Sequence, residues 1–421
     1  MSKIWDLIKN EKVEWKTIGE IGNLYTGLKS KNKYDFANGN FKYVSYVNIF
    51  NNDELNEDFI NDSVYIDKDE NQNNIKYGDI LFTGSSENLE EAGLSSVVNF
   101  YPREKTYLNS FSFGLRLNEP KVLIPKFSKY LFRSELIRKQ IISITTGVTR
   151  FNVSKEKFSK IKIPIPSIET QNKIVKILDK FNIYVKELEH ELEHRNKQYQ
   201  YYNELCFNDD FLKFLSNKYA AESIVENKTL NQLGVFIRGN NLTKKEIKNS
   251  GQPVVRYGEL HTKYKFETDF TYSFTNNDLF KKLKKAIKND LMIVLTSEDN
   301  DGVCKTCIWS GDYEIGISSD MCIFRGNVNP YFLNHFFSTE RFLKQKEKYL
   351  SGTNIIRISI DNLGKIDISL PSIVIQNLVS EKLNKLYKLS NSIYEGLPKE
   401  IKLRKQQYEY YRNKLLDFPK N

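Results

Sequence analysis

The chain has 421 residues, of which 40% are hydrophobic, so it is long enough for two or three domains that each bury a core. Lysine and arginine outnumber aspartate and glutamate by 63 to 53, and the formal net charge of +10 moderately favours a polyanionic partner. The 4 cysteines lack the spacing of a disulfide framework, so we predict no disulfides. No apolar stretch reaches the roughly 20 residues of a membrane span, and charged residues interrupt the N-terminal segment, which argues against a signal peptide. We therefore predict a cytoplasmic protein.

Residues 1–166 are predicted to form a first domain of short strands and loops with one helix. Aromatic and β-branched residues at Phe41–Val47 favour extended structure, and the apolar spacing within Pro125–Gln140 favours a helix. Three further extended segments are expected: a buried strand at Ile80–Phe82, a half-buried strand at Ser110–Leu117 and a closing segment at Ile161–Pro166, where prolines exclude a helix.

A long helix is predicted at residues 167–207. Apolar and aromatic residues recur there at alternating steps of four and three, which is the heptad pattern of a coiled-coil seam, and charged residues occupy the flanking positions. The seam positions are Ile174, Leu178, Phe181, Val185, Leu188 and Leu192. Residues 208–225, which begin Asn208-Asp209-Asp210, are expected to form a connector.

The same order then repeats. Residues 226–371 are predicted to form a second domain and residues 372–421 a second helix, whose seam includes Val379, Leu383, Leu386 and Ile393. Thr17–Gly22 recurs as Thr229–Gly234 at an offset of 229 − 17 = 212, and Gly147 and Gln171 recur as Gly352 and Gln376 at 352 − 147 = 205. A repeat of this length indicates a duplicated module with two similar surfaces related by approximate twofold symmetry.

The second helix is longer than the first by four residues. Gln171 to Gln198 spans 198 − 171 = 27 positions, whereas Gln376 to Gln407 spans 407 − 376 = 31. Because Gly396 and Pro398 lie in the additional segment, we expect a break or kink there.

One heptad helix cannot bury its seam alone, so the two helices are predicted to pair antiparallel, with the globular domains at opposite ends. About 40 helical residues at roughly 1.5 Å each would span roughly 60 Å. The expected fold class is α+β: two mixed α/β domains joined by two long antiparallel coiled-coil helices, with a pseudo-twofold internal repeat.

Three sequence features could indicate an enzyme or a metal site, but a structural role is favoured for each. Asn329–Phe332 is similar to part of the methyltransferase motif Asn/Asp-Pro-Pro-aromatic, but it lacks the second proline. No glycine-rich cofactor loop accompanies it, and the corresponding segment of the first copy, Ile124–Phe127, does not contain the motif. Cys304 and Cys307 have no second ligand pair for zinc, and the pair His190 and His194 lies off the helix seam. The sequence has no P-loop, so nucleotide hydrolysis by this chain is not expected.

Polar and partly basic loops occur at corresponding positions of both domains. Arginine, asparagine, serine and threonine side chains recognise base edges and hold phosphates, so these loops are candidate DNA-binding elements; the alternative for any single residue is an ordinary surface loop. The candidate residues are Lys29, Lys31, Lys33, Ser85, Ser86, Thr149 and Arg150 in the first domain and Arg238, Asn240, Asn241, Arg256, Tyr257, Ser297, Thr353, Asn354 and Arg357 in the second. A further basic segment, Lys281–Lys288, has no first-copy equivalent.

With these features the chain resembles the specificity subunit of type I restriction–modification systems over nearly its whole length. The resemblance rests on the duplicated order of variable domain and long helix, and on a strand–proline–helix junction followed by glutamine. The junction runs from Gly147 and Phe151 through Ile161–Pro166 to Gln171-Asn172, and again from Gly352 through Ile366–Ile368 and Leu370-Pro371 to Gln376-Asn377. In the family this glutamine usually follows a glutamate, where this chain has Thr170 and Ile375.

The resemblance implies two target-recognition domains, each of which recognises one half of a bipartite, asymmetric site in double-stranded DNA. It implies helices that fix the spacer between the halves and dock two methyltransferase subunits, which bind S-adenosylmethionine. Restriction subunits that translocate and cleave DNA with ATP and Mg would join them. The family's specificity subunit has no catalytic residue, cofactor or metal of its own.

Two alternatives remain open at this point. The first is a self-contained DNA methyltransferase or nuclease, for which Asn329–Phe332 is the only support. The second is a scaffold protein that does not bind DNA.

Overall fold

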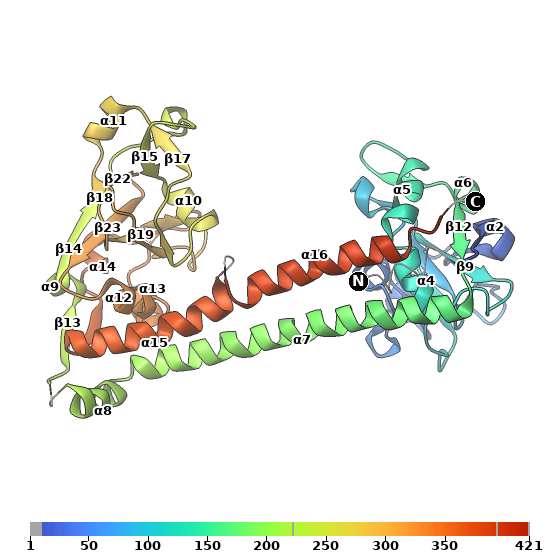
Figure 1. The fold of residues 1–421 in the computed structure, drawn as a ribbon, viewed down its shortest axis with the longest axis horizontal. Helices are drawn as coiled ribbons and strands as arrows, with labels where there is room; N and C mark the ends of the chain where they lie inside the picture. Colours follow the sequence, from blue (N-terminus) through green and yellow to red (C-terminus); the bar gives the residue numbers. More distant parts are fainter. Residues whose placement is uncertain (1–10, 221–222, 393–394, 420–421) are drawn as a thin grey trace. The chain divides into compact units, whose positions relative to one another are not determined.

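The computed structural model describes residues 11–220, 223–392 and 395–419. The chain forms two compact units, residues 1–188 with 401–421 and residues 189–400, so the division passes through the long helices (Figure 1). Each unit therefore contains a mixed α/β domain together with the adjoining parts of both helices.

The first unit is built on two main sheets. The larger sheet has the strand order β2–β9–β5–β7 and is antiparallel throughout; the smaller has the order β4–β3–β8, with β3 parallel to β8. The strands are β2 (Gly22–Thr26), β3 (Phe41–Val44), β4 (Ser63–Val64), β5 (Ile80–Thr83), β7 (Ser95–Val97), β8 (Thr106–Leu108) and β9 (Ser112–Leu117).

Two short sheets and five short helices complete this unit. Strand β1 (Glu14–Thr17) pairs with β12 (Lys162–Ile165), and β11 (Phe151–Val153) pairs with both β10 (Thr145–Thr146) and β6 (Ser85–Ser86). The helices are α2 (Ile18–Ile21), α3 (Tyr46–Asn51), α4 (Pro125–Leu131), α5 (Glu135–Ser143) and α6 (Lys155–Ser159).

Two predicted elements of the first domain differ from the structure. The strand expected to be half-buried, β9, lies between β2 and β5, and its polar Ser112 is only 3% exposed. The Tyr25 ring of the neighbouring strand β2 covers the other face of β9 at Gly114. A Cβ added to Gly114 would lie only 2.2 Å from that ring. The helix expected at Pro125–Gln140 is two helices, α4 and α5, separated at Ser134, which is the N-cap of α5.

The second unit repeats this arrangement with one additional strand in each main sheet. Its larger sheet has the order β14–β23–β19–β21–β16, and its smaller sheet has the order β17–β15–β22–β18, again with a parallel pair, β15 and β22. The strands are β13 (Glu226–Thr229), β14 (Gly234–Arg238), β15 (Gln252–Val255), β16 (Glu267–Thr268), β17 (Ser273–Thr275), β18 (Lys285–Ala286), β19 (Leu291–Val294), β20 (Thr296–Ser297), β21 (Thr306–Trp309), β22 (Ile315–Ile317), β23 (Met321–Gly326), β24 (Ile356–Arg357) and β25 (Asp367–Leu370).

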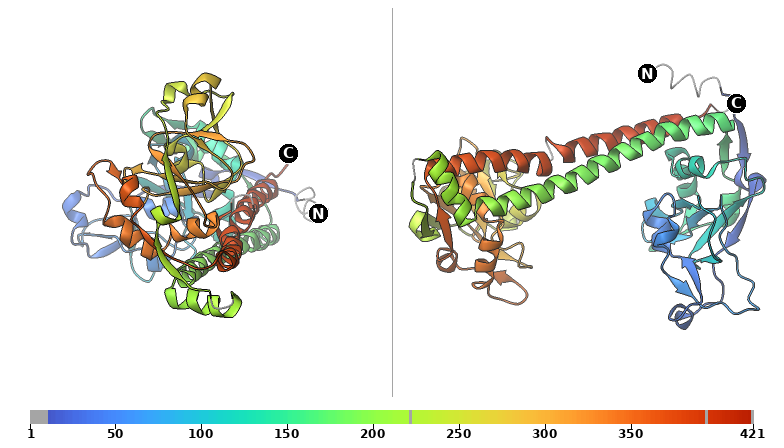
Figure 2. Two further views of the ribbon diagram at one scale, coloured as in Figure 1. Left: turned by 90° about the vertical axis from the view of Figure 1, so that its left-hand side faces the viewer. Right: turned by 90° about the horizontal axis from the view of Figure 1, so that it is seen from below.

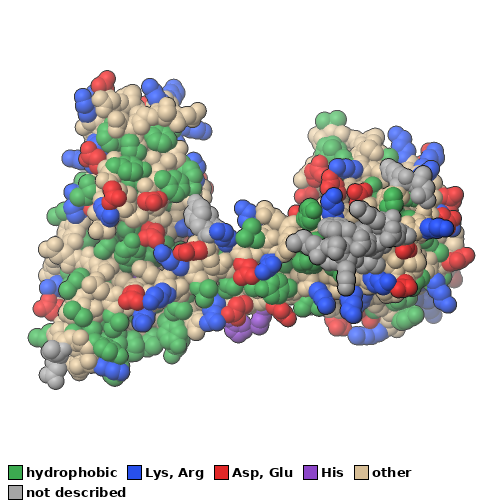
Figure 3. Space-filling view, viewed as in Figure 1, with side chains coloured by type: hydrophobic (Ala, Val, Ile, Leu, Met, Phe, Trp, Pro, Cys, Tyr) green, Lys and Arg blue, Asp and Glu red, His purple; other side chains and the backbone are tan. Residues whose placement is uncertain are grey.

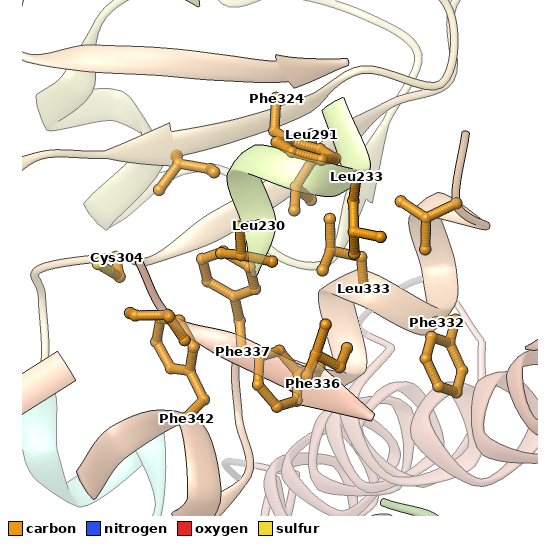
Figure 4. Packing of buried hydrophobic residues seen from close by; sticks show 14 of the residues in the cluster. Leu230, Leu233, Leu291, Cys304, Phe324, Phe332, Leu333, Phe336, Phe337 and Phe342 are labelled. Carbon is orange, nitrogen blue, oxygen red and sulfur yellow. The ribbon is translucent and has the colours of Figure 1, made fainter. Parts of the chain in front are cut away.

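The helices of the second unit pack around a core of aromatic and aliphatic side chains. In Figure 4, Leu333 extends from one of these helices toward Leu233 of another, whereas Phe332 of the same helix lies on the side of the long helices. The helices are α9 (Leu230–Leu233), α10 (Tyr257–Thr262), α11 (Asn277–Lys282), α12 (Pro330–Phe336), α13 (Glu340–Glu347) and α14 (Ile360–Leu363).

The long helix α7 (Ile168–Cys206) is continuous over 39 residues and contributes to both units. In the first unit Phe181 stacks on Tyr411 at 5.2 Å and Tyr184 receives the Arg404 guanidinium at 5.2 Å, so α7 and α16 (Leu397–Leu415) are antiparallel. In the second unit α7 contacts α15 (Ile373–Asn391) through Tyr199 and Tyr387, whose rings are 5.4 Å apart. Both views of Figure 2 show these helices side by side.

The predicted seam residues do more than join helix to helix. Ile174 and Leu178 are fully buried in the core of the first unit, and Val379 and Leu383 are buried in the core of the second. Nearer the middle of α7 the seam side chains are less buried: Val185 is buried, but Phe181, Leu188 and Leu192 are only half-buried. Leu386 of α15 is also half-buried. Ile393 lies outside the described residues.

The second long helix is broken where glycine and proline predicted a break. Helix α15 ends at Asn391 and α16 begins at Leu397, with Pro398 in the first turn of α16, where no backbone N–H is needed. Gly396 immediately before it has φ +83°, a conformation that favours glycine.

The expected connector at residues 208–225 contains a helix that the sequence analysis did not predict. Helix α8 (Asp209–Tyr219) begins after Asn208, whose side-chain oxygen accepts from the N–H groups of Asp210 and Phe211. An Asn followed by two acidic residues is a helix N-terminal signature, so the signal was present in the sequence.

A buried glutamine connects three elements at the same place in each unit. Gln171, which is 0% exposed, donates to the carbonyls of Val122 and Pro166 at 2.9 and 3.0 Å and accepts from the N–H of Ile124 at 3.0 Å. Ile124 is the N-cap of α4, so one side chain links the end of the closing strand, the start of α4 and the long helix.

Gln376 makes two of these three bonds in the second unit. It donates to Pro371 at 2.8 Å and accepts from the N–H of Asn329, the N-cap of α12, at 2.9 Å. The junction that the sequence repeats is therefore also repeated in its hydrogen bonds.

A buried histidine joins three helices in the second unit. His335 of α12 hydrogen-bonds through Nδ1 to the Tyr199 hydroxyl of α7 at 2.9 Å and through Nε2 to Asn384 Oδ1 of α15 at 2.8 Å. The amide oxygen of Asn384 can only accept, so Nε2 carries the proton and Nδ1 accepts from Tyr199. Burial lowers the pKa of His335 to about 4, against the opposing effect of Asn384.

Replacing either glutamine with leucine is expected to destabilise its unit. Gln171→Leu leaves the N–H of Ile124 and two buried carbonyls without this partner, which costs about 1–3 kcal/mol. The free energy of unfolding in urea, followed by circular dichroism, measures the effect. Lys176→Ala, an exposed change on the same helix, is the matched control, and equal stabilities of the two variants would contradict the assigned role.

His335 is expected to make the stability of the second unit depend on pH. In the unfolded chain its pKa is near 6.5, so below that pH the unfolded state binds a proton that the folded state excludes until about pH 4. The contribution of neutral, buried His335 to stability is therefore complete above pH 6.5. As the pH falls toward 4 this contribution is lost, and the free energy of unfolding decreases by up to about 3 kcal/mol. Urea unfolding between pH 7.5 and 5 should therefore be less pH-dependent for His335→Gln than for the exposed control His194→Gln.

Candidate nucleic-acid interface

In the first unit, three loops that are distant in the sequence meet around Phe111. The N–H of Gly27, after β2, donates to Ser112 at 3.2 Å, and the N–H of Gly84, after β5, donates to Phe111 at 2.7 Å. A Cβ at Gly27 would lie 1.9 Å from the carbonyl of Asn109, so this close approach requires glycine. The sheet thus places the predicted loops at residues 27–33 and 83–88 on either side of Phe111.

Arg150 lies over this junction. Its Nε donates to Ser85 Oγ at 3.3 Å, and its guanidinium is 5.2 Å from the centre of the Phe111 ring, which is 57% exposed. Lys155 is 5.7 Å from the ring of Phe113, and partial burial and then the positive charge of Lys29 lower the pKa of Lys155. Cationic and aromatic side chains therefore share one surface, which we call the Phe111 cluster: Lys29, Phe111, Arg150 and Lys155.

Four of the seven candidates in the first domain are exposed: Lys29, Lys33, Thr149 and Arg150. Ser85 and Ser86 were expected in an exposed loop, and this is wrong, because they form β6 and are 6% and 7% exposed. Their pairing with β11 encloses them, so Ser85 positions Arg150 instead. Lys31 is also enclosed, with a side chain 4% exposed that forms an ion pair with Glu70.

In the second unit, backbone and side-chain hydrogen bonds connect in series the four segments that carry the predicted residues, at 238–241, 256–257, 296–299 and 353–357. Asn240 and Tyr257 both meet Ser318: the N–H of Tyr257 donates to Ser318 Oγ at 3.0 Å, and Asn240 forms a parallel bridge with Ser318. His261 then approaches the carbonyl of Thr296 at 3.3 Å, and Thr296 pairs with Arg357 across β20 and β24.

Most candidates of the second unit are solvent-accessible. Arg256 and Ser297 are half-buried, and the exposed ones are Arg238, Asn240, Asn241, Tyr257, Thr353, Asn354 and Arg357. Between α10 and β20 the surface forms a groove of about 770 Å³. Its lining includes Tyr257, His261, Ser297, Asp299, Lys305 and Ile355.

The hairpin tips of both units have the same backbone requirement. Gly147 has φ +138° and Gly352 has φ +103°. A Cβ added at Gly147 would lie 2.0 Å from the carbonyl oxygen of Arg150, and one added at Gly352 would lie 2.1 Å from that of Ile355. Glycine at these positions lets each tip turn tightly and present the residues that follow it.

Several residues of these surfaces were missed in the sequence. Phe111 and Lys155 in the first unit and His261 and Lys305 in the second lie outside the predicted polar loops. None of these four residues has a distinctive signal in the sequence, because they become neighbours only through the tertiary fold.

The features that could have indicated an enzyme have structural roles. Asn329 caps α12 by accepting from the N–H groups of Tyr331 and Phe332. Cys304 and Cys307 are buried free thiols, and burial raises the pKa of Cys304 to about 12. Within the described ranges, no cluster of three or more His, Cys, Asp and Glu side chains is arranged to hold a metal ion.

In the described part of the chain, no helix is at once long enough and apolar enough to cross a bilayer.

A family model described as the type I restriction modification DNA specificity domain matches the chain twice, at residues 10–195 and 222–403. The EcoR124I/EcoR124II specificity subunit of Escherichia coli is 31% identical over 273 residues, which cover 62% of this chain and 65% of that protein. A putative type I restriction enzyme specificity subunit of Haemophilus influenzae, S.HindORF215P, is 26% identical over 98% of this chain and 97% of its own length.

Two solved structures share the fold. The S subunit of a type I restriction–modification system from M. genitalium aligns over 98% of this chain and 97% of its own with a TM-score of 0.52 and 15% identity. A chain from a structure on complex assembly and conformational transition of the type I R-M system aligns over 97% and 98% with a TM-score of 0.62 and 14% identity.

Proposed function

The chain belongs to the type I restriction–modification DNA specificity family, and we propose that each of its two units recognises one half of a bipartite site in double-stranded DNA. The observation that carries this proposal is a scaffold present twice that exposes polar loop residues in both copies, with different residues in each: Lys29, Thr149 and Arg150 in the first and Asn240, Thr353 and Arg357 in the second. One scaffold with two sets of loop residues suits two different half-sites.

The loop chemistry supports direct base recognition. Arginine donates two hydrogen bonds to guanine, asparagine pairs with adenine, and threonine contacts either base or phosphate. Arg150 is held by Ser85 and Phe111, so its guanidinium is oriented before DNA binds. In the second unit Arg357 lies in β24, the strand that pairs with β20, and β20 borders the groove that Tyr257 lines.

The long helices are proposed to set the spacer between the half-sites and to dock two methyltransferase subunits. Their outer positions are charged and exposed, with ion pairs such as Lys173–Glu169 and Lys197–Glu193, while their seams are used within the units. S-adenosylmethionine would be bound by the methyltransferase subunits, and ATP and Mg by restriction subunits, so this chain would supply recognition without catalysis.

Methylome sequencing of a host that expresses the chain with its methyltransferase partner tests the proposal. A bipartite methylated motif is expected. Arg150→Ala should relax one half of that motif and Arg357→Ala the other, each by about 1–3 kcal/mol of discrimination. Arg103→Ala, an exposed arginine paired with Glu57 and Asp58, should leave the motif unchanged; absence of any bipartite motif would refute the proposal.

Deleting Gly396–Lys399 should shorten the tolerated spacer or abolish methylation. Four residues correspond to roughly 6 Å of helix, and neighbouring bases are roughly 3.4 Å apart along a strand. The same methylome measurement gives the result, with Lys399→Ala as the control for local sequence. An unchanged spacer would mean that the segment between α15 and α16 is looped out.

A further inference from the structure

The lysine-rich segment of the second unit lies beside its candidate recognition loop. Lys281, Lys282 and Lys284, which we call the lysine strip, are all exposed, and none of them forms an ion pair with a carboxylate in the described part of the chain. The N–H of Lys284 donates to Asn240 Oδ1 at 2.9 Å, so the strip adjoins the loop that carries Asn240.

The first unit has a structural equivalent of this strip, although its sequence is unrelated. Arg116 and Arg325 occupy matching strands, and each makes a bidentate ion pair with a buried aspartate, Asp79 or Asp290. Arg116 Nη2 also donates to the carbonyl of Asn74 at 2.7 Å, and Arg325 Nη2 to that of Lys285 at 3.3 Å.

Lys285 and Asn74, whose carbonyls accept from these two arginines, are therefore equivalent positions, and they differ by 285 − 74 = 211. With the same offset, Lys281, Lys282 and Lys284 correspond to Glu70, Asn71 and Asn73. The structure therefore places acidic and amide side chains in the first unit where the second has lysines.

In the first unit this segment pairs with one lysine of the neighbouring loop and with the loop's backbone. Glu70 forms an ion pair with Lys31 at 2.5 Å, and the hydrogen bond from Lys31 lowers the pKa of Glu70 to about 2. Gln72 accepts from the N–H of Lys29 at 3.1 Å and donates to its carbonyl at 2.9 Å. The segment and the loop are thus bound to each other.

In the second unit the strip has a fixed backbone and exposed side chains. Phe280 and Leu283 are buried with Leu242 in a small core, and Lys285 lies 4.2 Å from the Phe280 ring while donating to the carbonyl of Leu283 at 2.7 Å. Figure 3 shows lysine and arginine side chains gathered at the end of this unit that carries α11 in Figure 1. The anchoring lysine and the buried core hold three positive charges at the surface.

We propose that the lysine strip binds the phosphate backbone of duplex DNA beside the half-site recognised by the second unit, an interaction that the first unit lacks. This inference rests on the proposed function. Lysine ammonium groups hold phosphates without distinguishing bases, so the strip adds affinity and salt dependence but no sequence preference. At this segment the two units would then differ, since the lysines of the second unit attract phosphate where Glu70, Asn71 and Asn73 stand in the first.

The test compares binding of the full chain, in complex with its methyltransferase partner, to duplexes with and without the methylated motif over a range of salt concentrations. The triple variant Lys281→Gln, Lys282→Gln, Lys284→Gln should weaken binding to both duplexes by a similar factor. It should reduce the slope of log K against log salt by roughly 0.9 for each phosphate that the variant no longer binds. The recognised motif should not change.

The matched control removes the same charge elsewhere. Lys121→Gln, Lys162→Gln, Lys365→Gln changes three exposed lysines outside both the long helices and the candidate recognition loops, and should leave the slope as it is. A second variant, Asn71→Lys, introduces a lysine into the equivalent strip of the first unit. It should increase the affinity and raise the slope by roughly 0.9, the value for one additional phosphate, which tests the idea without depending on the triple variant.

The outcomes separate the two proposals. If the unchanged chain shows no preference for any motif, the proposed function fails. If it prefers the motif, but the triple variant keeps the original slope or weakens binding no more than the control does, the strip does not bind phosphate. A changed motif in the triple variant would instead assign the strip to base recognition and overturn its role in phosphate binding.

Discussion

A buried glutamine at the start of each long helix fixes the geometry on which the rest of each unit depends. Gln171 and Gln376 bond the end of a closing strand and the first turn of a domain helix to the long helix. Because an unpaired amide or carbonyl in these cores would cost free energy, the junction has one satisfactory arrangement. The helix and the recognition loops of a unit consequently cannot vary independently at that point, which explains why this part of the sequence is repeated most faithfully.

Within this frame the two copies differ where they face solvent. The Arg116–Asp79 and Arg325–Asp290 pairs keep the sheets alike. The surface beside them carries Glu70 in one copy and Lys281 in the other. Duplication of a scaffold has therefore preserved these buried polar interactions and left the exposed electrostatics free to diverge, as the proposed recognition of two unlike half-sites would require.

The helical seam illustrates how a sequence pattern acquires a second role. Heptad spacing predicted helix pairing, and the stacking of Phe181 on Tyr411 agrees with an antiparallel pair in the first unit. At its ends, however, the same stripe supplies core residues to the domains, where Ile174 and Val379 are buried. The apolar face of a long helix is a surface to be covered, and the pattern does not specify whether a helix or a domain covers it.

The sequence by itself determined the duplication, the α+β class, the two long helices and the break at Gly396 and Pro398, because periodicity, proline and glycine act through local backbone geometry. It also located the polar loops of both domains. Only the tertiary structure decided which loop residues are available: it enclosed Ser85 and Ser86 in a strand, paired Lys31 with Glu70, and brought Phe111 beneath Arg150. Those outcomes depend on pairs such as Lys31 with Glu70 and Ser85 with Arg150, which are 39 and 65 positions apart, and such pairs leave no periodic trace in the chain.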